Sequence, residues 1–210
     1  MKNETSKNTV VKGNNVSSDK LLKTLFGNES QVVTKPVVHL HSLYLSGTIE
    51  SPDEYVEVFE TIRQAGKGDV VKIHINSYGG DLFTAIQFMR VIGECEAQTI
   101  ASVEGACMSA ATMIFLSCDG FEISENSMFM FHNYSGGTIG KGGEMFDQLI
   151  HERKWSEKML RGIYKDFLTE KEILQLLDNK DLWMDGDDVV KRLKKTTKKD
   201  KKVVDKEEEA

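Results

Sequence analysis

The sequence lacks the features of a membrane protein, a secreted protein or a disulfide-rich scaffold. No window reaches the ~18 to 20 consecutive apolar residues of a membrane span. The polar start of the chain, Met1 to Thr5, carries no apolar segment of a secretory signal. The cysteines are an odd number without metal-ligand spacing, and all lie among apolar residues: Cys95, Cys107 and Cys118. These absences predict a cytoplasmic protein whose thiols stay reduced.

A strongly basic surface is also missing. The formal net charge is -6, which gives no reason to expect a nucleic-acid partner. The sequence contains no internal repeat. With 210 residues, of which 40% are hydrophobic and 29% charged, the chain is long enough for one globular domain with a sizeable core.

Both ends of the chain differ in composition from the middle. Residues 1–36 are rich in Asn, Ser, Thr and Lys, which predicts a largely flexible N-terminal arm. Residues 194–210 combine a lysine-rich block with a final acidic run, and blocks of like charge cannot bury a core. We therefore expect one folded domain over residues 37–193, followed by a disordered tail.

Between the ends, segments typical of strands alternate with segments of helical spacing. Expected strands cover residues 37–49, 70–75, 99–103, 121–123 and 128–132, and expected helices cover residues 51–64, 81–92, 109–116, 146–167, 169–177 and 185–193. Ser51 with Glu54, and Thr169 with Glu172, predict capping boxes, and Gly93 predicts a helix stop. Such alternation predicts an α/β fold built from βαβ units.

Ser109 opens a predicted buried helix, and its surroundings suit a nucleophile. A serine hydroxyl needs a neighbouring base to take its proton, and His132 ends an apolar strand-like run 23 residues further on. The unpaired amides of a helix N-terminus favour negative charge, so the amide of Ala110 could hold an oxyanion. Gly79 and Gly80 would let a second backbone donor approach closely. Each feature is common alone, but their combination indicates a serine hydrolase.

Three linked segments carry a closer resemblance. They are Asn76-Ser77-Tyr78-Gly79-Gly80, Gly105-x-x-x-Ser109 and Met130-Phe131-His132. Their text and separations resemble the proteolytic subunit of the Clp protease (the ClpP family), over roughly residues 40–193. The resemblance implies an α/β, ClpP/crotonase-like fold of repeated ββα units with a protruding strand–helix handle. It also implies a serine endopeptidase that cleaves peptides or unfolded proteins inside an oligomeric chamber.

The resemblance assigns roles to individual residues. Ser109 would be the nucleophile and His132 its base, with Asp181 as third member of the triad and Asp178 as the alternative. The amides of Gly80 and Ala110 would form the oxyanion hole. Substrate would pair with the backbone on both sides of the nucleophile, at Gly79, Gly80, Asp81, Tyr134, Ser135 and Gly136.

The family pattern also implies partners. A heptameric ring, doubled into a chamber of fourteen subunits, would be assembled through a glycine-rich strand and a helix from about Gly143. An ATPase unfoldase is a further implied partner, although the tyrosines of the family's docking cleft are not evident here. No metal or cofactor is expected in this chain. Tyr78, Ala111 and Asn133 depart from the family text, and none of these changes removes a catalytic atom.

Parts of the sequence are compatible with other functions. Residues 136–143 do not form a phosphate-binding loop, because Gly142 stands where such a loop needs Ser or Thr. Acyl-CoA hydratases share the broad fold but lack a Ser–His pair. A Ser–Lys dyad would need a lysine near Ser109, and the Ser109 motif contains none. Cys107 could serve as a nucleophile but suits the core better. A catalytically silent scaffold or ring subunit, and a bacteriophage head-maturation protease, both stay open.

Overall fold

A central sheet organises the protein. The computed structural model describes residues 38–195, so the expected arm over residues 1–36 and the tail beyond residue 195 lie outside the described residues. Within residues 38–195 the strand order is β1-β2-β3-β5-β6, with β4 also paired to β3. The strands are β1 (Leu40–Ile49), β2 (Val70–Gly80), β3 (Gln98–Met108), β4 (Gly120–Ile123), β5 (Met128–Phe131) and β6 (Leu182–Asp185). The expected α/β class is confirmed.

The sheet is parallel except at one edge. Strands β1, β2 and β3 pair in parallel, and β3 continues into parallel pairing with β4 near Ile100 and with β5 near Cys107. Among the strands of residues 38–195, only β6 runs antiparallel, against β5. Because parallel strands end at the same edge, the segments that follow β2, β3 and β5 meet there.

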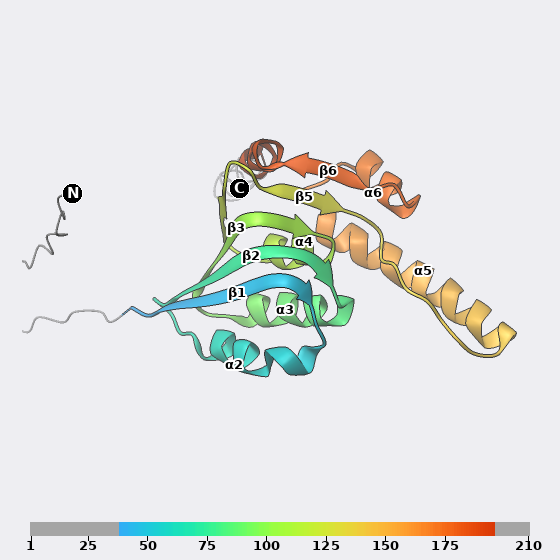
Figure 1. Ribbon diagram of the computed structural model, residues 1–210, viewed down its shortest axis with the longest axis horizontal. Coiled ribbons are helices and arrows are strands. Elements are labelled where there is room, and N and C mark those ends of the chain that lie inside the picture. The colour runs from blue at the N-terminus through green and yellow to red at the C-terminus, as the bar shows by residue number, and fades with distance from the viewer. Residues whose placement is uncertain (1–37, 196–210) are drawn as a thin grey trace, which may run out of the picture. The chain divides into compact units, whose positions relative to one another are not determined.

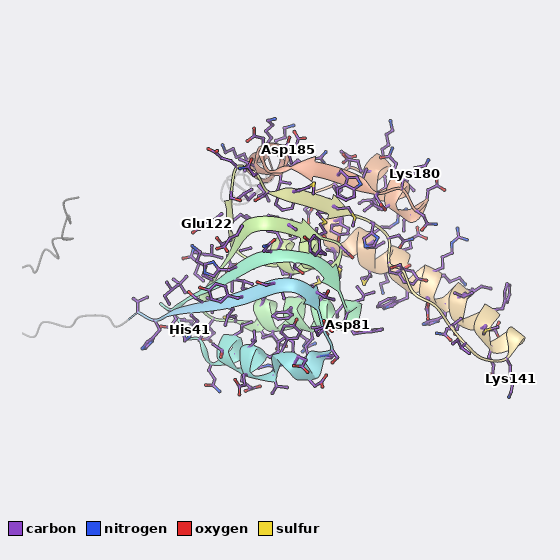
Figure 2. All side chains as sticks on the ribbon, in the orientation of Figure 1. His41, Asp81, Glu122, Lys141, Lys180 and Asp185 are labelled. Atoms are coloured by element: carbon purple, nitrogen blue, oxygen red, sulfur yellow. The ribbon has the colours of Figure 1, made fainter. Side chains whose placement is uncertain are left out.

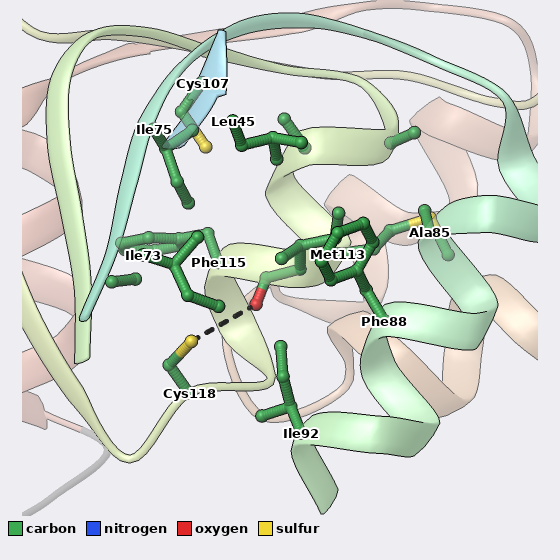
Figure 3. Packing of buried hydrophobic residues seen from close by; sticks show 14 of the residues in the cluster. Leu45, Ile73, Ile75, Ala85, Phe88, Ile92, Cys107, Met113, Phe115 and Cys118 are labelled. Carbon is green, nitrogen blue, oxygen red and sulfur yellow. Dashed lines mark hydrogen bonds between the residues drawn. The ribbon is translucent and has the colours of Figure 1, made fainter. Parts of the chain in front are cut away.

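Helices cover one face of this sheet (Figure 1). They are η1 (Pro52–Tyr55), α2 (Val56–Gln64), α3 (Leu82–Glu94) and α4 (Ala110–Leu116). Strand β2 alternates accordingly: Val71, Ile73 and Ile75 are at most 1% exposed, whereas Lys72 and His74 point to the other face. Figure 3 shows strand side chains packed against those of α3 and α4. Apolar burial of this kind supplies most of the driving force for folding.

The C-terminal part of the described chain adds three helices. They are α5 (Gly142–Tyr164), α6 (Glu170–Leu177) and a last helix over residues 186–195. The C-terminal half of α5 buries Leu160 and Tyr164 in the core, whereas its N-terminal half extends away from the sheet (Figure 1). Phe146 and Leu149 on that half are 64% and 50% exposed. A protruding helical handle is therefore present.

Local predictions had mixed outcomes. The capping box at Thr169 is confirmed, but the one at Ser51 is wrong, because the Ser51 hydroxyl donates to the Asp53 carboxylate instead of capping the helix. Gly93 does not stop α3, which runs on to Glu94. Strand β2 continues through Gly80, and α5 starts four residues before the expected Phe146. The expected glycine-rich strand after His132 is not formed in the described residues.

One ion pair ties α6 to the last helix. Arg192 donates from Nη1 and Nη2 to the two carboxylate oxygens of Glu172, at 3.0 and 2.7 Å. Glu172 also accepts from the Thr169 amide at 2.8 Å. The Arg192 guanidinium is the main cause that lowers the pKa of Glu172 from 4.5 to about 2.

We predict that Glu172→Gln lowers the free energy of unfolding at pH 7 by about 2 kcal/mol. A depressed pKa in the folded protein means that the carboxylate stabilises the fold above the unfolded value of 4.5, and that this contribution is lost as pH falls toward 2. Urea unfolding at several pH values should show the wild type and the variant converging in acid. A gap that stays constant from pH 7 to pH 3 would contradict this. Glu170→Gln is the control: it breaks only a largely exposed ion pair with Arg161 and should lower the free energy of unfolding far less.

Candidate active site

Ser109 lies on a sharp turn between β3 and α4. Its backbone has φ 55° and ψ −127°, a conformation that L-residues rarely adopt. The Ser109 amide donates to the Met130 carbonyl of β5 at 2.8 Å, which fixes the turn against the neighbouring strand. Strained backbone of this kind costs ~1–3 kcal/mol and concentrates at functional sites.

The Ser109 side chain contacts a base. Its Oγ lies 2.5 Å from Nε2 of His132, which directly follows β5. Although Ser109 is the residue before α4, its hydroxyl makes no capping hydrogen bond to the helix. The hydroxyl is therefore engaged with the imidazole, which is the contact that an activated serine requires.

Gly79 passes directly behind Ser109. A Cβ built on Gly79 would lie 2.6 Å from the Ser109 Cβ and 2.8 Å from the Met108 carbonyl. Its φ of 89° is also one that favours glycine. Ser77 fixes this end of β2 by donating to the Gly47 carbonyl at 2.7 Å and accepting from the Gly79 amide at 3.1 Å. Any side chain at position 79 would displace Ser109.

The two expected oxyanion donors face a small cavity. A pocket of about 60 Å³ is lined by Ser109, His132, Gly80 and Ala110 together with apolar side chains. The Ser109 amide is occupied by Met130, so Ala110 supplies the next amide along the chain. The rest of the lining mixes apolar and polar side chains that carry no charge: Leu82, Met113, Met159 and Leu160 with Asn133, Tyr134, Ser135 and Tyr164. The pocket suits an uncharged group beside the reacting carbonyl.

A wider groove continues from this pocket. It measures about 510 Å³, and five of the six expected substrate-binding residues line it: Gly80, Asp81, Tyr134, Ser135 and Gly136. Gly79, the sixth, is buried. Asp81 stands at the sheet edge from which α5 extends (Figure 2), and its carboxylate accepts from the Thr84 amide at 2.7 Å. The Asp81 backbone is also engaged, because its amide donates to the Ile49 carbonyl at 2.8 Å and its carbonyl accepts from the Ala85 amide at 3.2 Å.

Sequence reasoning missed the aromatic wall of the groove. Phe83 and Trp155 stack with their ring centroids 5.9 Å apart, and Phe83 is 67% exposed. Phe83 belongs to the first turn of α3, and Trp155 lies four residues before Met159 on α5. This helical spacing was visible in the sequence, but it does not reveal which face of α5 meets the groove.

The expected third member of the triad is not in contact with His132. Asp181 is exposed just before β6, and within residues 38–195 no hydrogen bond joins it to the imidazole. Asp178 pairs with Lys180 at 3.0 Å. The residue after the histidine makes a different hydrogen bond: the side-chain amide nitrogen of Asn133 donates to the side-chain oxygen of Asn179 at 3.0 Å. The role of Asp181 stays a prediction.

Other chemistry finds less support in the described residues. Cys107 is fully buried, and burial raises the pKa of its thiol well above the usual range, so it stays a protonated core residue. No group of three or more His, Cys, Asp or Glu residues in this part of the chain is arranged to hold a metal ion. Nor is any helix among residues 38–195 long and apolar enough to cross a bilayer.

Comparison with protein families assigns the chain to one of them. Residues 41–192 match the family model described as Clp protease, which covers more than half of the chain. The protein therefore belongs to the Clp protease family, and a peptidase of the ClpP type is what this membership supports. A search of curated proteins finds no match.

Proposed function

We propose that the protein is a serine endopeptidase whose nucleophile is Ser109. The observation that carries this proposal is the 2.5 Å contact between the Ser109 hydroxyl and His132 Nε2, at a strained turn in a Clp protease chain. His132 would take the hydroxyl proton while the oxygen attacks the peptide carbonyl, and would then protonate the leaving amine. Water would release the acyl group by the same steps in reverse.

The oxyanion of each tetrahedral intermediate would lie between the amides of Gly80 and Ala110. Each such donor typically contributes roughly 10²–10³-fold to the rate, because it faces charge that develops only in the transition state. Both residues line the pocket that holds the Ser109 hydroxyl, which supports this assignment. No cofactor or metal enters the reaction.

The substrate would be an extended peptide lying in the groove. Residues 132–140 form no strand in the described chain, so their backbone could pair with an added peptide strand, while Gly80 and Asp81 face it from the other side. The small pocket beside Ser109 would take one uncharged side chain of the peptide. Segments of unfolded proteins have the extended backbone that this arrangement requires.

Assembly into rings would enclose the site. Four apolar side chains on the handle are between 41% and 102% exposed: Ile139, Phe146, Leu149 and Ile150. Such a surface favours contact with another copy of the chain. A heptameric ring, stacked into a double ring of fourteen, is the proposed state, and an ATPase unfoldase is the proposed partner for folded substrates.

A second candidate is a ring subunit that is silent at rest. The observation that favours it is the missing carboxylate contact at His132 in the described residues. A histidine without an orienting partner adopts the productive tautomer less reliably, and loss of that partner lowers turnover steeply in serine proteases.

Labelling with a fluorescent peptide phosphonate tests the main proposal. We expect covalent label on Ser109, located by mass spectrometry of the wild-type protein, and loss of both label and peptidase activity in Ser109→Ala. Ser117→Ala is the matched control, because this serine caps the far end of α4 and should leave activity unchanged. Full activity in purified Ser109→Ala would eliminate the proposal, and an unlabelled but folded wild type would favour the silent subunit.

The third member of the triad is tested by paired substitutions. We expect Asp181→Asn to lower kcat by about 10²–10⁴-fold, because the imidazolium would lose its stabilising carboxylate. Asp178→Asn, three residues away on the surface, should stay within about 2-fold of the wild type. Steady-state kinetics on a fluorogenic peptide distinguish the two, and the reverse order of effects would assign the role to Asp178.

The handle is tested by the size of the assembly. We expect the wild type to sediment near fourteen times the chain mass of 23.6 kDa. The double variant Phe146→Glu/Leu149→Glu should give smaller species, because it places charge on the apolar handle. Leu174→Glu, at an equally exposed position of α6, is the control and should keep the large species. A wild type that sediments as a monomer would refute the chamber.

A further inference from the structure

A buried chain of hydroxyl groups lies beneath the Ser109 turn. The Thr112 Oγ1 is 2.6 Å from the Ser109 carbonyl oxygen and 2.7 Å from the Tyr164 hydroxyl. Thr112 is 0% exposed and Tyr164 is 1% exposed. Thr112 belongs to α4 and Tyr164 to the end of α5, 52 positions later in the sequence. Two helices therefore meet at one carbonyl of the active-site turn.

The direction of these hydrogen bonds follows from chemistry. A carbonyl oxygen only accepts, so Thr112 must donate its single hydroxyl hydrogen to Ser109. Thr112 can then only accept from Tyr164, which donates. Burial raises the pKa of Tyr164 well above its ordinary range, so the phenol keeps this proton. Donors in series polarise one another, which strengthens the terminal bond to Ser109.

The Ser109 carbonyl belongs to the same peptide unit as the Ala110 amide. A trans peptide is planar, and its C=O and N–H point in opposite directions. Fixing the oxygen toward Thr112, beneath the turn, therefore fixes the N–H on the opposite side. The Thr112 amide also donates to this oxygen, at 2.9 Å, so one carbonyl is held by two donors and cannot rotate without losing both.

We propose that Thr112 and Tyr164 are positioning residues that orient the Ser109–Ala110 peptide, so that the Ala110 amide points at the developing oxyanion. This inference rests on the proposed peptidase function. Neither side chain touches the reacting atoms through its hydroxyl. They act on the transition state by orienting the Ser109–Ala110 peptide plane. Their loss should therefore lower kcat and leave ground-state binding of the substrate nearly unchanged.

Three substitutions separate this role from packing. Thr112→Val keeps the shape and removes the hydroxyl, Thr112→Ser keeps the hydroxyl, and Tyr164→Phe keeps the ring that packs on Phe131 with centroids 5.6 Å apart. We expect Thr112→Val and Tyr164→Phe to lower kcat about 10-fold, a fraction of what loss of a whole donor costs, with KM within about 2-fold. Thr112→Ser should recover kcat to within about 3-fold of the wild type.

A transition-state analogue supplies the second readout. Affinity for a peptide boronate, whose tetrahedral adduct places an oxygen in the oxyanion hole, should fall by the same factor as kcat/KM across the series. Thr99→Val is the matched control. It removes another buried threonine hydroxyl, which donates to Asp119 at 2.8 Å away from the site, and should leave kcat unchanged.

The outcomes are distinguishable. Unchanged kcat in both Thr112→Val and Tyr164→Phe, in a wild type that is labelled at Ser109, overturns the positioning role alone. The same holds if the loss falls entirely on KM, or if Thr112→Ser is as slow as Thr112→Val. A wild type without any Ser109 labelling removes the proposed peptidase, and this inference with it. If Thr112→Val does not fold, Thr112→Ser and Tyr164→Phe decide the matter.

Discussion

The close approach of Gly79 to Ser109 is the contact on which the site depends. Strand β2 must pass behind the turn at a distance where a Cβ would overlap the Ser109 Cβ and the Met108 carbonyl. Such an approach requires glycine, and it requires neighbouring strands that hold both backbones still. The surrounding polar residues of the motif provide that restraint.

Asn76 and Ser77 stabilise the irregular end of β2. The pairing register between β2 and β3 shifts after Ile75, where the Asn76 side chain accepts the Ala106 amide at 3.0 Å. This substitutes for a backbone partner that the shifted register no longer supplies. A Cβ on Gly105 would lie 2.7 Å from the same side-chain oxygen. Since Ser77 binds the Gly47 carbonyl of β1, the motif links three strands around Ser109.

How far the sequence predicted these features depended on how local each one is. The Thr169 capping box was predictable, because all its partners lie within three residues. The same pattern failed at Ser51, where Asp53 competes for the hydroxyl. The Ser109–His132 pair was predicted from the local motifs and from the family resemblance, and its contact is present. Periodicity could not predict the Thr112–Tyr164 bond, because it depends on where the end of α5 meets α4.

The two halves of the site differ in how firmly they are held. The Ser109 turn is held by Met130, by Gly79 and by the buried Thr112–Tyr164 chain, so Ser109 and the Ala110 amide are fixed together. His132 instead begins a segment that forms no strand through residue 140 in the described chain. In the proposed peptidase, alignment of the imidazole would therefore depend on what pairs with that segment, whether a bound peptide or a neighbouring handle. A peptide that supplies this pairing would order the base as it binds, and so would join substrate recognition to completion of the catalytic geometry.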